Sequence, residues 1–373
     1  MERKVKVVYI ISEINKAIAF EWIAEYINNT KFELSFILLN PGVTDLEKHL
    51  TEKGLSVKNI IFRGKRDWFS AIRQTYKILR KIKPDAIHCH MMQANIIGLS
   101  AGKLAGIKKR IYTRHHSSLH HVYFPKGVLW DKYFNRMATH IVAISDIVKK
   151  ILINWEKANP KKIILIPHGF LLDDFAVVAK ERVERFKRNT HINGKYPVIG
   201  VISRFTEWKG VQYVIPAFNE ILKDFPNAVL ILLNAHGDYE NTIFSLLQKI
   251  PNQSFRTVRF ENDIAAVYKS MDIFVHVPID EHSEAFGQIY IESLASGVPS
   301  IFTLSGIAPD FIVNKYNAVT VPFKNSTAIN TAALEILKDQ NLQINLKKNG
   351  IESVSRNFGI QKMIDALEKL YNN

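Results

Sequence analysis

Two glutamates frame the stretch 284-EAFGQIYIESLASGVPS-300, whose apolar residues suit a buried helix. Glu284 precedes the helical pattern and Glu292 lies within it. Because one helical turn takes 3.6 residues, positions 288 and 292 share a face that continues back toward Glu284. Two carboxylates on one side of a cleft would accept hydrogen bonds from pairs of hydroxyls, such as those of a sugar or a ribose. The structural alternative is that Glu284 complements the helix dipole and Glu292 pairs with a surface lysine.

A second group of polar residues, in 203-SRFTEWKG-210, follows an apolar run typical of a strand. Arg204 and Lys209 come after this strand, and Gly210 opens a helical pattern. Cations beside a helix N-terminus favour an anion, since free N–H groups and the helix dipole attract negative charge. The spacing suits a diphosphate, with forked hydrogen bonds from the arginine and a point charge from the lysine. The alternative is that both cations are simply solvated.

The elements that must position these residues alternate between strand and helix patterns. Strand patterns cover residues 5–12, 32–40, 86–90, 109–116, 140–145, 162–169, 197–203, 228–234, 272–278, 299–303 and 317–322. Helical patterns cover residues 18–29, 73–85, 94–106, 210–225, 287–296 and 326–339. This alternation predicts parallel sheets covered by helices on both faces. The predicted fold class is α/β, with two doubly wound, Rossmann-like domains.

A charged segment at 173–194, which contains an Asn-Gly pair, interrupts the alternation and is interpreted as a linker. It separates a first domain at 1–172 from a second domain at 195–355. The last residues, 356–373, are predicted to form one amphipathic helix. Doubly wound sheets bind ligands beyond the carboxyl ends of their strands, so we expect two domains that face each other across a ligand-binding cleft.

Composition excludes several classes of protein. Of the 373 residues, 47% are hydrophobic and 23% are charged, as in ordinary globular proteins. The single cysteine, Cys89, excludes an internal disulfide framework and a cysteine-based zinc site, which favours a reducing, cytoplasmic setting. No window has the roughly 18 apolar residues of a membrane span, and the start of the chain is not typical of a signal peptide.

The net charge of +15 is concentrated in the first half of the chain. Residues 1–190 contain 34 Lys and Arg against 17 Asp and Glu, whereas residues 191–373 contain 16 against 18. This asymmetry indicates a partner of the first half: nucleic acid, an anionic membrane surface or an acidic substrate. Cations mixed with aromatic or apolar residues at 103–110 and 123–137 favour the membrane surface. Solubility alone is the alternative explanation.

Five segments together resemble family 4 of the retaining GT-B glycosyltransferases, in that family's order. EAFGQIYIESLASGVP resembles its E-x7-E motif, and SRFTEWKG resembles its strand-end arginine with a downstream Lys-Gly. IHCHMMQANIIGLSAGKLAGIKKRIYTRHH resembles its stretch ending in Thr-x-His, VAISDIVKKILI its serine followed by a helix, and IPHG its Pro-Asn-Gly turn. The resemblance covers residues 85–323.

The resemblance implies a role for each matched residue of the second half. Arg204 and Lys209 would neutralise the diphosphate of a nucleotide sugar, Glu284 would hold hydroxyls of the donor sugar, and Glu292 would hold those of the ribose. The remaining donor contacts would come from the backbone of Ala285, Phe286 and Gly287, with the base against the loop at Phe260–Asp263. The family characteristically needs no bound metal, so no metal and no cofactor are expected beside the nucleotide-sugar substrate.

In the first half, the Thr-x-His motif of the family falls on Thr113 and His115, near the reacting centre and the acceptor. The implied catalytic residues are then His115, Arg204, Lys209 and Glu284. His116 is an adjacent competitor for the role of His115, and His168 stands where the family has an asparagine. The alternative for both adjacent histidines is a surface position at the end of a strand. The final helix is expected to cross back to the first domain.

Three positions depart from the pattern of the family. The loop after the first strand, ISEINKAIAF, lacks its usual glycines, which leaves open how the acceptor is held. Ser305-Gly306 replaces a Gly-Gly pair, and Asp310 replaces a glutamate.

The predicted activity is retaining hexosyl transfer (EC 2.4) from a UDP- or GDP-sugar to a hydroxyl of a lipid-linked or glycan acceptor, in cell-surface polysaccharide or glycolipid synthesis. The expected location is the cytoplasm, with peripheral attachment to the inner membrane. The alternatives are a sugar-nucleotide epimerase, a weakly active relative that only binds donor and, more distantly, a nucleic-acid-binding protein. No known nucleic-acid-binding motif is present, and the absence of G-x-G-x-x-G disfavours a dinucleotide dehydrogenase.

Overall fold

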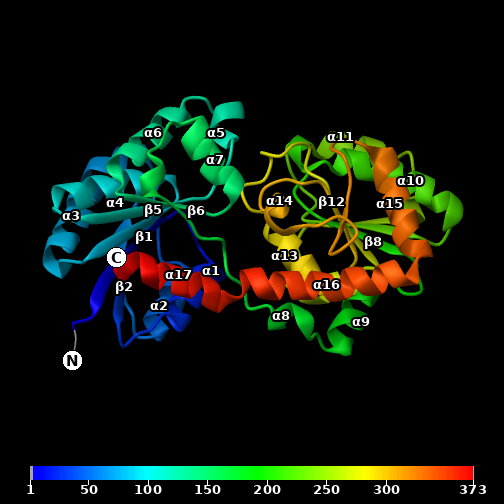
Figure 1. Cartoon of the computed structure of the whole chain (residues 1–373), viewed down its shortest axis with the longest axis horizontal. Helices are drawn as coiled ribbons and strands as arrows, with labels where there is room; N and C mark the ends of the chain where they lie inside the picture. Colours follow the sequence, from blue (N-terminus) through cyan, green and yellow to red (C-terminus); the bar gives the residue numbers. More distant parts are fainter. Residues whose placement is uncertain (1–2, 373) are drawn as a thin grey trace. The chain divides into compact units, whose positions relative to one another are not determined.

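The computed structural model describes residues 3–372, which fold as two α/β units (Figure 1). The first unit holds the described residues up to Phe170 together with those from Ile360 on, and the second unit spans Leu171–Gly359. Each unit is built around its own parallel sheet, as expected for two doubly wound halves.

The sheet of the first unit has seven parallel strands in the order β3-β2-β1-β4-β5-β6-β7. The strands are β1 Val5–Ser12, β2 Phe32–Asn40, β3 Ser56–Ile61, β4 Ala86–His90, β5 Lys109–Arg114, β6 His140–Ala143 and β7 Ile163–Leu165. The order reverses between β1 and β4, which makes the carboxyl ends of these strands the expected place for a ligand.

Helices link these strands, because neighbouring parallel strands need a crossover. They are α1 Ile18–Tyr26, α2 Asp45–Glu52, α3 Trp68–Ile82, α4 Met92–Leu104, α5 Leu119–Val122, α6 Gly127–Met137 and α7 Asp146–Asn154, with short 3₁₀ turns at Lys65–Asp67 and Pro160–Lys162. This unit also contains α17 Ile360–Asn372, from the end of the chain. Small residues let α4 lie close to the sheet: a Cβ on Gly98 would stand 2.5 Å from the Cys89 sulfur, and one on Gly102 would stand 2.3 Å from Ile87.

The sheet of the second unit has six parallel strands in the order β10-β9-β8-β11-β12-β13, with the reversal between β8 and β11. The strands are β8 Val198–Ile202, β9 Val229–Leu233, β10 Phe255–Val258, β11 Ile273–His276, β12 Ser300–Phe302 and β13 Val319–Thr320. Its helices are α8 Asp173–Ala176, α9 Lys180–Asn189, α10 Val211–Asp224, α11 Glu240–Leu247, α12 Ile264–Lys269, α13 Gln288–Ala295, α14 Ala308–Phe311, α15 Ser326–Lys338 and α16 Gln340–Phe358, with 3₁₀ turns at Glu207–Lys209 and Asn252–Ser254. Apolar side chains from β8, β9 and β11 pack with those of α10 and α15 in its core.

The expected linker at 173–194 is wrong, because this segment folds as α8 and α9 within the second unit. On α9, Phe186 is buried, and Arg182 donates to Asp263 at 2.9 Å. Asp263 in turn caps α12 by accepting from the backbone of Ala266. The charges that suggested a linker therefore belong to the exposed face of an amphipathic helix and to an ion pair that holds it in place.

The expected single helix at 356–373 is also wrong, since α16 ends at Phe358 and α17 begins at Ile360 after Gly359. Helix α17, red in Figure 1, packs on α1 and β1 of the first unit. Its amide at Ile360 donates to the carbonyl of Phe170 at 3.0 Å, at the point where the chain passes from one unit to the other. The predicted apolar stripe along α17 is buried at Ile360, Met363, Ile364, Leu367 and Leu370.

Candidate functional site

Three loops meet at the carboxyl edge of the second sheet, next to its topological reversal. The loop after β8 carries Lys209, the loop after β11 carries Glu284, and the loop after β12 carries Ser305. Lys209 forms an ion pair with a carboxylate oxygen of Glu284, and the amide of Glu284 donates to the Ser305 hydroxyl at 3.1 Å. The sequence separates these residues, and the parallel topology brings them together because the strands that precede them all end at the same edge.

The carboxylate of Glu284 is also 3.1 Å from Nε2 of His276, the last residue of β11. Burial alone would raise the pKa of Glu284, but the charge of Lys209 and the hydrogen bond from His276 outweigh burial and lower it to about 2. Glu284 is thus an ionised, buried acceptor between two donors. Sequence reasoning missed His276, whose only signal is a polar residue at the end of an otherwise apolar strand.

Two glycines let the backbone approach this cluster closely. Gly210 has φ +75°, and a Cβ there would stand 1.8 Å from the carbonyl oxygen of Val277. Gly306 has φ +63°, and a Cβ there would stand 2.7 Å from the Cβ of Glu284. Both positions therefore require glycine, because other residues would strain the backbone and collide with it.

Arg204 differs from Lys209 in having its guanidinium exposed. Within residues 3–372, its side chain forms no ion pair or hydrogen bond, whereas Lys209 is tied to Glu284. Arg204 thus presents a cation with unused donors at the end of β8, available to an anionic ligand.

Glu292 lies within α13, where Tyr268 of α12 donates to its carboxylate at 3.0 Å. Burial raises the pKa of Glu292 to about 7, although the hydrogen bond from Tyr268 opposes the shift. The contacts of Glu292 are separate from those of Glu284, which precedes the helix. Sequence reasoning had no signal for Tyr268, because only the packing of α12 against α13 brings it to Glu292.

The other predicted donor residues lie in different surroundings. Phe260 is 76% exposed in the loop between β10 and α12, so its ring is available for stacking. Phe286 is buried edge-on against Phe358, and its carbonyl accepts from the amide of Ile307 at 2.9 Å. Ala285 precedes it in the same loop, and Gly287 (φ +86°) is the N-cap residue just before α13.

A separate cluster of histidines lies at the carboxyl ends of β4 and β5 in the first unit. His88 bonds to the Thr113 hydroxyl through Nε2 at 2.8 Å, and His90 Nδ1 is 3.0 Å from His115 Nε2. The His115 ring stacks on that of His168, with centroids 5.8 Å apart and planes within 8°. Of the predicted acceptor-side residues, the structure therefore brings His115 and His168 into contact. Thr113 lies two residues before His115, within β5.

Burial lowers the pKa values in this cluster, to about 3 for His88 and His115 and to about 4 for His168. The pKa of His90 is also lowered, by burial and by the neighbouring histidines. These imidazoles are neutral at physiological pH. Sequence reasoning missed His88 and His90, although two histidines spaced by two residues in the apolar strand AIHCH must point to the same face.

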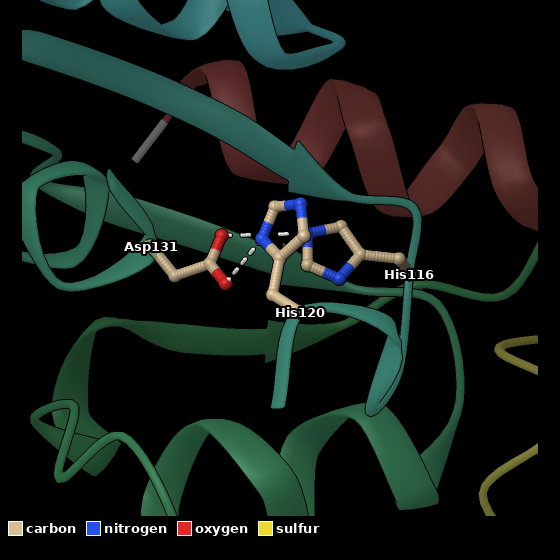
Figure 2. A group of neighbouring side chains, drawn as sticks. All are labelled: His116, His120 and Asp131. Atoms are coloured by element: carbon tan, nitrogen blue, oxygen red, sulfur yellow. Dashed lines mark hydrogen bonds and ion pairs between the residues drawn. The ribbon is translucent and has the colours of Figure 1, made fainter. Parts of the chain in front are cut away.

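His116 belongs to a different group of side chains from His115, together with His120 and Asp131 (Figure 2). Its Nε2 is 3.3 Å from Oδ1 of Asp131 on α6, and its ring lies 4.1 Å from that of His120. Arg114, at the end of β5, pairs with Asp131 at 2.6 Å and with Glu156. The two adjacent histidines therefore have different environments, which the sequence left open.

Comparison with known families identifies this architecture. The family described as "Glycosyltransferase Family 4" matches residues 23–174, and the family described as "Glycosyl transferases group 1" matches residues 182–353. The chain belongs to the GT-B glycosyltransferases. This confirms the predicted enzyme class, whereas the roles of individual residues stay predictions.

Two relatives and one solved structure illustrate the similarity of this GT-B glycosyltransferase to known proteins. The capsular polysaccharide biosynthesis glycosyltransferase CapM of Staphylococcus aureus is 27% identical, over 82% of this chain and 81% of CapM. The UDP-Gal:alpha-D-GlcNAc-diphosphoundecaprenol alpha-1,3-galactosyltransferase of Escherichia coli is 24% identical, over 79% of this chain and 77% of that enzyme. The crystal structure of Anabaena HepE in complex with UDP and glucose matches with a TM-score of 0.84 over 99% of each chain at 15% identity, which confirms the fold.

Exposed apolar and basic side chains of this GT-B glycosyltransferase occur together at residues 122–136, named here the α5–α6 patch. Phe124 and Leu129 are 60% and 72% exposed, and Lys126, Lys132 and Arg136 are exposed close to them in the sequence. Among the helices of residues 3–372, none has the length and apolar character needed to cross a bilayer.

Proposed function

We propose that this GT-B glycosyltransferase transfers a hexosyl group, with retention of anomeric configuration, from a UDP- or GDP-sugar to a hydroxyl of a lipid-linked or glycan acceptor. The observation that carries the proposal is the group formed by half-buried Lys209 with buried Glu284 and His276, since the loop that carries Lys209 also carries the exposed Arg204. It combines cations for a diphosphate with an ionised acceptor for sugar hydroxyls at one edge of one sheet.

The donor binds to the second unit in this proposal. Arg204 and Lys209 contact the diphosphate, Glu284 accepts from sugar hydroxyls, and Glu292 accepts from the ribose. The base stacks on Phe260, and the backbone of residues 285–287 completes the site. The E. coli relative is named for UDP-Gal and HepE was solved with UDP and glucose, which favours UDP as the nucleotide.

The transfer step needs positive charge where the leaving group develops negative charge. The bond from C1 of the sugar to the diphosphate oxygen breaks, and the acceptor oxygen bonds to C1 from the same face. The acceptor proton passes to the leaving phosphate. Arg204 and Lys209 stabilise the departing diphosphate, and losing one such contact typically costs about two to three orders of magnitude in rate. These two residues supply this charge, and no metal has a role at the diphosphate.

The acceptor binds to the first unit, near the histidine cluster around His115 and Thr113. A neutral, half-buried imidazole whose pKa is about 3 is a weak base, which fits the use of the leaving phosphate as the proton acceptor. His115 and His168 therefore position the acceptor. The names of CapM and of the E. coli enzyme favour a pathway of surface polysaccharide assembly with a lipid-linked acceptor.

A lipid-linked acceptor places the enzyme at a membrane surface. The α5–α6 patch offers both ingredients of reversible attachment, namely exposed apolar side chains and cations for anionic headgroups. We propose that this patch attaches the enzyme to the cytoplasmic face of the inner membrane.

Calorimetry with UDP, GDP, ADP and CMP tests the donor site. We expect one diphosphate to bind tightly, and binding to weaken at least about tenfold in Arg204→Ala and in Lys209→Ala, which corresponds to about 1.4 kcal/mol. Arg204→Ala removes an exposed side chain that forms no hydrogen bond or ion pair within residues 3–372, so it tests the site even where Lys209→Ala is unstable. Lys223→Ala, which removes an exposed lysine of α10 paired with Glu220, is the matched control. Absence of binding to every nucleotide by the folded protein would remove the main support for the proposal.

A second experiment tests the transfer itself. With the UDP- or GDP-sugar whose nucleotide calorimetry selects and an undecaprenyl-diphosphate sugar as acceptor, NMR of the product reports the configuration at C1. Retention is expected. Turnover of the donor sugar in the absence of any acceptor would instead indicate an epimerase.

A further inference from the structure

The first unit contains a compact group of three side chains that have no role in the proposed transfer. They are His116, His120 and Asp131. Their ligand-type atoms all lie within 4.8 Å of one another (Figure 2). Asp131 Oδ2 is 2.7 Å from His120 Nδ1, and Asp131 Oδ1 is 3.3 Å from His116 Nε2. Two imidazole nitrogens and one carboxylate oxygen are a donor set that zinc accepts in proteins with one open position.

The local sequence supports this arrangement. His116 and His120 are separated by three residues, which is a ligand spacing common in zinc sites. His120 lies on the short helix α5, and Asp131 lies on α6, whose first residue is Gly127. A Cβ on Gly127 would stand 2.5 Å from the His120 ring, so glycine is needed there for His120 to reach Asp131.

The distances require little movement to admit an ion. Tetrahedral ligands at the usual zinc bond lengths of about 2.0–2.2 Å lie roughly 3.3 Å apart. The distance from His120 Nδ1 to Asp131 Oδ2 must widen by about 0.6 Å to match this value, and the His116 ligand atom lies within 4.8 Å of the other two. Asp131 is fully buried, whereas the His116 and His120 side chains are 24% and 12% exposed, which leaves a route for an ion and a water ligand.

The charges around the group are compatible with a divalent cation. Arg114 lies 2.6 Å from Asp131 Oδ1 and would repel a metal ion, but it is also paired with Glu156 at 2.5 Å. The charges of Arg114 and Glu156 cancel. The group of His116, His120 and Asp131 therefore has one net negative charge, which comes from Asp131. Arg114 then pairs with Oδ1 of Asp131, and Oδ2 stays available to an ion; carboxylates that bind metal ions are commonly oriented in this way by a further side chain.

We propose that His116, His120 and Asp131 bind one zinc ion that ties the β5–α5 loop to α6. The ion lies in the first unit, and the donor diphosphate remains with Arg204 and Lys209. The proposal is therefore independent of the transfer chemistry.

Zinc titration of the full chain, without an affinity tag and after treatment with a chelator, tests the proposal. We expect one equivalent of Zn²⁺ to bind, measured by competition with a chromophoric chelator. The double variant His116→Gln and His120→Gln should bind zinc more weakly by over 100-fold, since loss of a residue that only orients a metal ligand already costs about 10–100-fold. His121→Gln is the matched control, because His121 is adjacent in sequence but contacts Glu156 at 3.3 Å instead of Asp131.

Several outcomes would overturn the proposal. They are the absence of stoichiometric zinc binding by the wild-type chain, equal affinity in the double variant, and equal loss in His121→Gln. Loss of zinc in His168→Gln with retention in the double variant would assign the ion to the other histidine cluster and would also overturn it. Because the double variant is open to misfolding, cobalt is added to the wild-type protein as a second measurement. Visible bands of tetrahedral cobalt are expected, and a spectrum of octahedral aqueous cobalt would contradict the assignment.

Discussion

Glu284 and Glu292 show how surroundings decide the chemistry of a residue type. Lys209 and His276 outweigh the burial of Glu284 and hold its pKa at about 2, so this carboxylate is ionised throughout the physiological range. Glu292 is half-buried, its carboxylate accepts from a tyrosine hydroxyl, and desolvation raises its pKa to about 7. The pair therefore combines a permanent anion with a carboxyl group that titrates near neutral pH.

The raised pKa of Glu292 predicts a pH dependence of stability. Between pH 4.5 and 7, the native state holds a proton on Glu292 that the unfolded state has lost, so the free energy of unfolding falls as the pH rises through this window. Glu292→Gln removes this decline. Urea unfolding at a series of pH values measures the free energy of unfolding of both proteins. The difference between wild type and variant should change by about 1–3 kcal/mol from pH 4.5 to 7.5.

A matched variant separates this effect from general changes of charge. Glu207→Gln removes an exposed glutamate of the same unit, and its pH curve should run parallel to that of the wild type. If the Glu292→Gln curve is also parallel, Glu292 does not titrate in this window and the prediction is wrong.

At the scale of elements, short loops at the ends of strands hold the site, and their backbone conformation matters as much as their side chains. The loop between β8 and α10 turns at Gly210 so that Lys209 reaches Glu284. In the first unit, helix α17 helps to hold the histidine cluster. Its Tyr371 bonds to His88 Nδ1 at 2.8 Å and to the hydroxyl of Tyr9, so the last helix supports the strand that carries the histidine cluster.

Gly210→Ala should destabilise the protein and weaken nucleotide binding. The added Cβ combines an unfavourable positive φ with a contact 1.8 Å from the Val277 carbonyl, so the loop must shift and move Lys209. We expect a loss of about 2 kcal/mol or more and at least about tenfold weaker binding of the diphosphate. Thermal unfolding and calorimetry measure the two effects.

Gly194→Ala is the control for the energetic cost of placing alanine at a positive φ. Gly194 has φ +69° but no heavy atom within 4 Å of the added Cβ, so this variant should lose only the roughly 1–2 kcal/mol of the positive φ and keep nucleotide affinity. Equal effects of the two substitutions would mean that the close approach to Val277 is not what constrains the loop.

Tyr371→Phe should destabilise the first unit. Removing the hydroxyl leaves His88 Nδ1 and the Tyr9 hydroxyl buried without a partner, which typically costs about 1–3 kcal/mol. Tyr26→Phe, at an exposed tyrosine of α1, should leave the unfolding midpoint unchanged. An unchanged midpoint in Tyr371→Phe would show that these groups find other partners.

At the scale of the whole molecule, the two units divide charge and chemistry between them. The first 190 residues carry a net charge of +17, and the remainder carries −2. The group around Glu284 lies in the near-neutral second unit, and the α5–α6 patch lies in the basic first unit. The basic residues are therefore concentrated in the unit that we propose binds the acceptor, and not in the unit that we propose binds the donor.

Vesicle sedimentation tests whether this charge serves a membrane. Binding to vesicles with anionic lipid should be strong at low salt and should fall as ionic strength rises, because salt screens contributions of about 1 kcal/mol per cation near the surface. Phe124→Ser combined with Leu129→Ser should reduce binding even at low salt. Val177→Ser, at an 82% exposed residue of the second unit, should have no effect. Failure to bind at every salt concentration would refute membrane attachment.

Several parts of the fold could be predicted from the sequence because they depend on local patterns. Apolar runs locate β1, β2 and β4 residue by residue. Arg204 directly follows a strand pattern, and Lys209 and Glu284 lie in the loops that follow strand patterns. Other elements lack a clear pattern. Strand β3 is half polar because it lies at an edge of the sheet, and α9 carries so many charges that it resembled a linker.

By itself, the sequence determined the α/β class, the two sheets and the positions of strand-end residues, because burial imposes a period on each element that neighbouring residues reveal. Only the tertiary structure decided which distant side chains meet. Lys209 and Glu284 are 75 residues apart, and His88 and Tyr371 are 283 residues apart. Such pairs depend on strand order, crossovers and the return of the last helix. These features cannot be read from any local sequence pattern. They determine the pKa of Glu284, the partners of His115 and the group around Asp131.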